Sequence, residues 1–137
     1  MSSTPRVLFV CVKNGGKSQM AAGLMSKVDA DSVDVQSAGT APGSAINALS
    51  AQSLLEVGVD ISANTPQNID PELLAQMDVV IILGREARPP VVDGPRYENW
   101  DTDEPSERGI DGIERMRLIR DDIAARVTDL TARLTTF

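Results

Sequence analysis

The chain has 137 residues, 42% of them hydrophobic and 24% charged, which is typical of one globular domain spanning residues 1–137. Its formal net charge of −7 at pH 7 disfavours nucleic acid or an anionic membrane surface as a partner. Histidine is absent and cysteine occurs once, which excludes Cys-His and Ser-His-Asp catalysis, histidine-ligated metals and zinc–cysteine clusters, so no metal site is expected.

The first third of the chain predicts a strand, a turn and a helix. Residues 6–11 contain the apolar run 7–10 and predict a buried strand. Residues 19–28 then carry apolar side chains at helical spacing, namely Met20, Ala21, Leu24, Met25 and Val28. A short strand is expected over residues 33–37, which completes a βαβ unit.

The middle of the chain predicts two helices and the most apolar strand. A helix is expected over residues 44–57. Asp70-Pro71 supplies a cap and a first helical position for a second helix over residues 72–77. Residues 78–83 (DVVIIL) then predict a buried strand.

The last part of the chain predicts one weak strand and one long amphipathic helix. After a proline-rich loop, residues 96–100 are expected to form the strand and residues 101–111 a loop. One face of the final helix would carry Ile110, Ile113, Met116, Ile119, Ile123, Val127, Leu130 and Leu134. Strands that alternate with helices predict a parallel sheet covered on both faces, with the functional site outside the carboxyl ends of the strands.

The segment after the first strand, CVKNGGKS at residues 11–18, carries the candidate chemistry, and we call it the cysteine loop. A strand, a glycine-containing turn and a helix start direct backbone N–H groups and the positive end of the helix at one point. Two of the three lysines, Lys13 and Lys17, lie in this loop, which holds no acid. These features predict a small anion as ligand and Cys11, attacking as the thiolate, as nucleophile.

Two other interpretations of the cysteine loop remain open. Gly16-Lys17-Ser18 fits the second half of the phosphate-binding motif G-x-x-x-x-G-K-[ST] of nucleotide hydrolases. However, Cys11 stands at the first glycine of that motif, and residues 78–83 end without an aspartate to hold magnesium. A lone cysteine can also be an inert buried residue. The position of Cys11 before a glycine-containing turn with two lysines favours a reactive thiol.

The residues around the loop resemble one known family. VLFVCVKNGGKSQMAAGLM, VQSAGT at 35–40, DVVIIL at 78–83 and RYENW at 96–100 are similar to the arsenate reductase branch of the low-molecular-weight protein tyrosine phosphatase superfamily. The similarity covers essentially the whole chain and is greatest to actinobacterial arsenate-mycothiol transferases. It implies a three-layer α/β fold, with a four-stranded parallel sheet flanked by helices, and covalent attack by Cys11 on an anion held by loop amides.

The chain departs from the family pattern at three points. Lys17 stands where the phosphatases have arginine, and it offers a point charge in place of a bidentate fork. The phosphatase Asp-Pro pair aligns with Glu104-Pro105, so that either Glu104 or the adjacent Asp103 is a candidate general acid. The two further cysteines with which thioredoxin-coupled arsenate reductases resolve their adduct are missing, so the second thiol must come from outside.

The resemblance therefore implies arsenate reduction by thiol transfer, with mycothiol as co-substrate, a mycoredoxin-type redoxin downstream and no bound cofactor. Low-molecular-weight phosphatase activity and a non-catalytic oxyanion-binding or thiol-sensing module remain alternatives. Residues 1–6 are too short for a signal peptide, which predicts a cytoplasmic location. The expected catalytic residues are Cys11, Lys17, Ser18, Asp103 and Glu104, and the expected anion-binding residues are Val12, Lys13, Asn14, Gly15, Gly16, Lys17 and Ser18.

Overall fold

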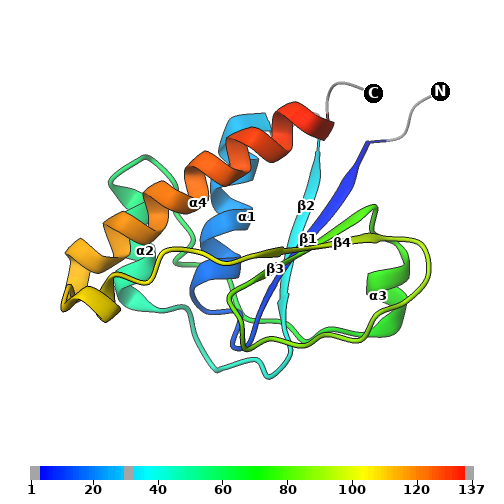
Figure 1. Cartoon of the computed structure of the whole chain (residues 1–137), viewed down its shortest axis with the longest axis horizontal. Helices are drawn as coiled ribbons and strands as arrows, with labels where there is room; N and C mark the ends of the chain where they lie inside the picture. Colours follow the sequence, from blue (N-terminus) through cyan, green and yellow to red (C-terminus); the bar gives the residue numbers. More distant parts are fainter. Residues whose placement is uncertain (1–3, 30–32, 135–137) are drawn as a thin grey trace.

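The centre of the structure, a computed structural model that describes residues 4–29 and 33–134, is a four-stranded sheet (Figure 1). The parts of the expected single domain at residues 1–3, 30–32 and 135–137 lie outside the described residues. The sheet has the order β2-β1-β3-β4, and every pairing is parallel. The strands are β1 (Arg6–Cys11), β2 (Asp34–Gly39), β3 (Val79–Leu83) and β4 (Arg96–Trp100). The predicted parallel α/β architecture is confirmed.

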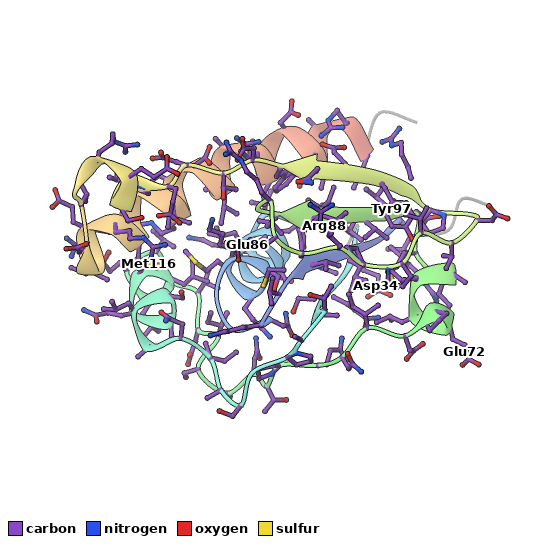
Figure 2. All side chains as sticks on the ribbon, turned by 60° about the horizontal axis from the view of Figure 1, so that its bottom comes forward. Asp34, Glu72, Glu86, Arg88, Tyr97 and Met116 are labelled. Atoms are coloured by element: carbon purple, nitrogen blue, oxygen red, sulfur yellow. The ribbon has the colours of Figure 1, made fainter. Side chains whose placement is uncertain are left out.

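Helices cover the two faces of this sheet unequally. One face carries α1 (Lys17–Asp29), α2 (Ala48–Leu55) and α4 (Gly112–Leu134), which pack against one another. Figure 2 shows Met116 at the junction of α4 and α2, where its side chain is buried. The opposite face is covered by the short helix α3 (Pro71–Ala75) and by the loop after β3. None of the described helices has the length and apolar character that crossing a bilayer requires.

The central strand β1 fixes the position of the cysteine loop. Its side chains alternate between the two faces: Phe9 packs with the α1 and α4 core, whereas Leu8 and Val10 pack with the α3 side. All three are fully buried, and the Phe9 ring lies 5.7 Å from that of Trp100 at the end of β4. Because β1 is held from both faces, Cys11 at its carboxyl end has a defined place at the edge of the sheet.

Several boundaries differ from the sequence expectations: α1, β2 and α3 are observed at 17–29, 34–39 and 71–75, where 19–28, 33–37 and 72–77 are expected. The helix expected over residues 44–57 begins only at Ala48, because the side chain of Asn47 caps it by accepting a hydrogen bond from the Ser50 N–H. Ile110 precedes α4 and is not part of its buried face. The expected loop 101–111 contains a short 3-10 helix, η1 (Pro105–Arg108), which Glu104 caps in the same way through Ser106.

Candidate active site

The cysteine loop runs from the end of β1 into α1, and the neighbouring segment 40–47 holds it in place. Backbone N–H groups of that segment donate to its outward carbonyls: Thr40 to Cys11, Ala41 to Val12, Gly43 to Lys13 and Asn47 to Gly15. In a trans peptide the carbonyl and the following N–H point in opposite directions, and the described residues contain no cis bond. Each carbonyl held outward therefore turns the next N–H to the opposite side, as an anion-binding loop requires.

One of these N–H groups shows which side that is. The Asn14 N–H donates to the Sγ of Cys11 over 3.2 Å, so the inward side of the loop is the side of the sulfur. Asn14 reaches this geometry with a φ of 54°, in the left-handed region that asparagine tolerates better than most residues. Asn14, which is expected among the anion-binding residues, therefore has a direct hydrogen bond to the candidate nucleophile.

The side chains behind the sulfur form a chain of hydrogen bonds with a defined direction. The Gln67 backbone N–H donates to Asn14 Oδ1 over 2.9 Å, which fixes the orientation of the amide. Asn14 Nδ2 then donates to Ser18 Oγ over 2.8 Å. Ser18 Oγ lies 2.9 Å from Cys11 Sγ, where either atom can be the donor; toward a thiolate only the hydroxyl can donate. Because Ser18 and Asn14 are fully buried, the Ser18 hydroxyl and the Asn14 N–H keep fixed positions that face the sulfur.

Gly39 at the end of β2 allows the closest approach of another strand to the loop. A Cβ built at this position would lie 2.6 Å from the Val12 carbonyl oxygen and 3.1 Å from the Asn14 nitrogen. Both are backbone atoms, which can move only if the whole loop moves. Gly39 is thus a supporting residue of the site, within the VQSAGT segment, which in the sequence carries a family resemblance but no residue role.

The substitution Gly39→Ala is expected to lower the free energy of unfolding by about 1–3 kcal/mol, as overpacking against fixed atoms does. Urea denaturation measures the loss, and anion binding should weaken with it. Gly43→Ala is the matched control, because its Cβ would lie 3.8 Å from its nearest neighbour, the Cβ of Lys13. Equal stability of the two variants would mean that the loop tolerates displacement at Gly39.

A cavity of about 610 Å³ opens beside Cys11, and we call it the thiol cavity. It brings together Cys11, Val12, Gly16, Lys17, Asp103 and Glu104 of the predicted site. The structure places Lys13 and Gly15 elsewhere, on a second cavity of about 480 Å³ that shares Gly16 and Lys17 with the first. Lys17 is therefore the loop lysine on the side of the sulfur.

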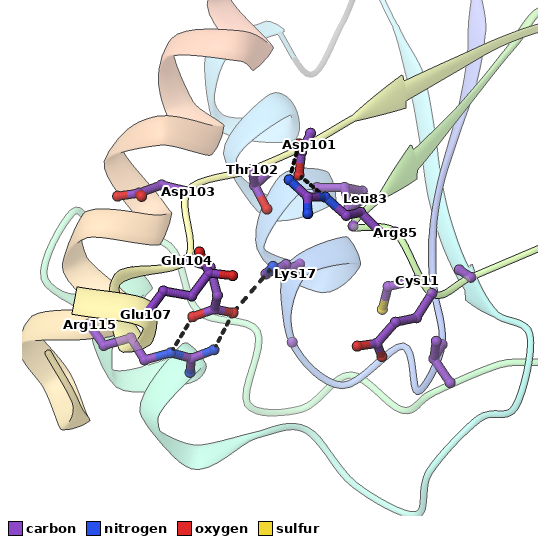
Figure 3. A pocket seen from close by; sticks show the side chains of 15 residues that line it. Cys11, Lys17, Leu83, Arg85, Asp101, Thr102, Asp103, Glu104, Glu107 and Arg115 are labelled. Carbon is purple, nitrogen blue, oxygen red and sulfur yellow. Dashed lines mark hydrogen bonds and ion pairs between the residues drawn. The ribbon is translucent and has the colours of Figure 1, made fainter. Parts of the chain in front are cut away.

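The far wall of the thiol cavity holds a cluster of charges (Figure 3). Arg115 of α4 donates to both carboxylate oxygens of Glu104, from Nε over 2.9 Å and from Nη2 over 2.8 Å. The Nζ of Lys17 lies 3.7 Å from the same carboxylate, and the Ser106 hydroxyl donates to it over 2.8 Å. These contacts, led by the hydrogen bonds from Arg115, lower the pKa of Glu104 to about 2.

The neighbouring carboxylates are paired in the same manner. Arg108 donates to both oxygens of Asp103 and lowers the pKa of this carboxyl, and Arg85 does the same for Asp101. Neither Asp103 nor Glu104 therefore holds a proton near neutral pH. Their ionised form counts against proton donation from this state, because a proton donor must be protonated before it acts, and the general-acid role of Asp103 or Glu104 stays a prediction.

Several residues of the thiol cavity carry no signal in the sequence. Arg115 belongs to a helix whose polar face has many arginines, and nothing in its spacing separates it from the others. Glu86 and Arg85 come from the loop after β3, and Figure 2 shows Glu86 over the carboxyl end of the sheet. Among the described residues no group of His, Cys, Asp and Glu is placed to hold a metal ion.

The sequence of the chain is similar to those of known proteins. Residues 6–136 match the family described as low molecular weight phosphotyrosine protein phosphatase. The arsenate reductase of Halalkalibacterium halodurans is 32% identical over 127 residues, covering 88% of this chain and 91% of the relative.

Two solved structures are also similar. An arsenate reductase in its phosphate-binding state has a TM-score of 0.83 and 30% identity, and the match covers 96% of this chain and 99% of the other. A thioredoxin-dependent arsenate reductase of Corynebacterium glutamicum has a TM-score of 0.80 and 34% identity over 97% of this chain. The chain spans 63% of the length of that Corynebacterium protein.

Proposed function

The chain belongs to the low molecular weight phosphotyrosine protein phosphatase family and to its arsenate reductase branch, and we propose that it reduces arsenate by transferring arsenic from Cys11 to an external thiol. One observation carries the proposal: the Cys11 sulfur faces two fixed donors, the Ser18 hydroxyl and the Asn14 N–H, at a cavity that also holds Lys17. The names of the similar proteins support arsenate as the oxyanion.

In the first step the Cys11 thiolate attacks arsenic(V). A sulfur–arsenic bond forms, one arsenate oxygen leaves as water, and arsenic keeps its oxidation state. The loop N–H groups and Lys17 stabilise the negative oxygens. Since Asp103 and Glu104 are held as carboxylates, the departing oxygen takes its protons from arsenate itself, which is partly protonated near neutral pH.

In the second step a thiol from outside the chain must act, because the chain has only one cysteine. Its thiolate attacks arsenic, forms a new sulfur–arsenic bond and releases the Cys11 thiolate. A redoxin thiol then attacks the sulfur of the released adduct, and the sulfur–arsenic electron pair passes to arsenic, which becomes arsenic(III) as a mixed disulfide forms. We propose mycothiol and a mycoredoxin-type redoxin for these roles, on the resemblance of the chain as a whole to the mycothiol transferases.

Two alternatives follow from the same site. Hydrolysis of a phosphate ester uses the same thiolate, but Lys17 lacks the bidentate fork that grips a phosphoryl group in the phosphatases. A non-catalytic module that binds oxyanions or senses oxidants would need the loop and Cys11 but no thiol partner.

Turnover with different thiols tests the proposal. Arsenate would be supplied with mycothiol and mycoredoxin, with glutathione and glutaredoxin, or with no thiol, and consumption of NADPH by the coupled reductase would be measured. We expect steady turnover with mycothiol, weaker turnover with glutathione and none without thiol. Hydrolysis of an aryl phosphate in the absence of thiol would favour the phosphatase, and oxidation of Cys11 without turnover in any arm would favour the sensor.

A further inference from the structure

The Glu104 carboxylate lies between two cations and binds them unequally. Arg115 holds it through two hydrogen bonds of 2.8 and 2.9 Å, whereas the Nζ of Lys17 is 3.7 Å away. Two-bond guanidinium pairing is much stronger than an ion pair at that longer distance. The carboxylate therefore interacts mainly with Arg115, and the positive charge of Lys17 remains available to an anion in the thiol cavity.

Glu104 cannot simply turn away from Lys17 if Arg115 is lost. Its Oε2 also accepts the Ser106 hydroxyl over 2.8 Å and, as the cap of η1, the Ser106 N–H. The carboxylate would then stay beside the wall of the cavity with Lys17 as its nearest cation. The side chains of Lys17, Glu104 and Arg115 are only 23%, 30% and 31% exposed, so water screens this exchange of partners only in part.

We propose that Arg115 is a positioning residue for the anion site: by pairing with Glu104 it prevents this carboxylate from neutralising Lys17, the loop lysine on the side of the Cys11 sulfur. The role rests on the proposed function only in the identity of the oxyanion. It requires that Arg115 act through Glu104, and no contact between Arg115 and the bound anion is part of it. With Arg115 present, the cluster of Lys17, Arg115 and Glu104 has a net positive charge; without it, the charges of Lys17 and Glu104 cancel.

The chain offers a matched control on the same helix. Glu56 also lies between two cations, with Arg117 in two-oxygen contact and Arg120 beside it, but none of these residues lines the thiol cavity. Arg117→Gln thus removes the same kind of ion pair as Arg115→Gln, on the same helix but outside the thiol cavity. A general effect of losing an ion pair on α4 would appear in both variants.

Protection of Cys11 from alkylation measures the anion site without any reductase activity. The full chain would be treated with iodoacetamide at increasing concentrations of inorganic phosphate, and in a second series of arsenate. For Arg115→Gln we expect the half-protecting concentration to rise roughly three- to fivefold, the upper part of the range for a partly exposed ion pair. Arg117→Gln should leave it within about twofold of the natural chain, the scatter expected at surface pairs.

The double variant Glu104→Gln/Arg115→Gln decides the mechanism. With the competing carboxylate removed, Lys17 is again unopposed, so the half-protecting concentration should return to within about twofold of the natural value, a non-additive outcome that marks coupled residues. A double variant as weak as Arg115→Gln would mean that Arg115 contacts the anion directly, and would overturn the proposal. Equal protection in Arg115→Gln and the natural chain, or no protection by either anion, would overturn it too.

Turnover gives an independent readout where the chain reduces arsenate. Arg115→Gln should raise the arsenate KM and leave kcat at saturating arsenate nearly unchanged, and the double variant should restore KM. A chain that shows the protection pattern without arsenate turnover would retain the role of Arg115 and refute only the proposed reaction.

Discussion

Replacing Cys11 with serine is expected to reduce arsenate turnover about a thousandfold or more, to background, the scale on which losing a nucleophile acts. The serine hydroxyl would remain within reach of Ser18, but it ionises far less readily than a thiol. No histidine exists in the chain to take its proton, and no second cysteine can replace it. Coupled NADPH consumption with mycothiol and arsenate measures the loss.

Two measurements on the same variant separate the loss of the nucleophile from the loss of the fold. Serine is close to cysteine in shape, so the melting temperature should stay within about 3 °C of the natural value, which corresponds to a change of at most about 1 kcal/mol. Phosphate binding, followed by calorimetry, should persist because the loop N–H groups and Lys17 remain. Turnover above background in Cys11→Ser would contradict the covalent mechanism.

Without any added thiol, arsenate is expected to yield at most one arsenic bound per chain and no arsenite. The reason is a count of sulfur atoms: resolving a cysteine–arsenic bond requires a second sulfur nucleophile, and Cys11 is the only cysteine. Intact-protein mass spectrometry measures the bound arsenic, and arsenite is quantified in solution. Adding mycothiol should discharge the adduct and start cycling.

Thioredoxin provides the decisive second arm of that experiment. The similar Corynebacterium protein is named as thioredoxin-dependent, and a thioredoxin thiol could in principle attack the arsenic on Cys11 directly. We expect thioredoxin with its reductase to leave the adduct in place. With a single cysteine, the chain cannot form the internal disulfide that thioredoxin would reduce. Rapid cycling in this arm, without a small thiol, would refute the transferase mechanism and keep Cys11 as the nucleophile.

The parts of the fold that follow from local patterning could be predicted from the sequence. The apolar runs that form β1 and β3, and the cap at Asp70, lie where their residue types place them. The start of α2 could not be predicted, because the backbone of the segment before it forms a hydrogen bond to the cysteine loop and does not continue the helix. The N–H of Asn47 donates to the Gly15 carbonyl over 2.7 Å, a long-range contact that no local pattern contains.

The candidate site divides in the same way. The cysteine loop is one continuous segment, so its glycines, lysines and thiol are visible together in the sequence. The charge state of Glu104 depends on Arg115 and Lys17, which come from two other elements. An acidic residue before a proline looks like a proton donor in the sequence, and only the arrangement in space shows that its partners keep it ionised.

The chain of hydrogen bonds behind Cys11 also indicates which positions depend on their side chain and which only on their backbone. The group that sets its direction is the peptide N–H of residue 67, which every amino acid except proline supplies. A substitution at position 67 therefore keeps this donor, because it belongs to the backbone. Substitutions at Asn14 and Ser18 would remove hydrogen bonds, because there the side chains form them. The requirement at position 67 is the course of the backbone. A hydrogen bond from the Gly39 N–H to the Gln67 carbonyl, 2.9 Å long, fixes this course relative to the end of β2.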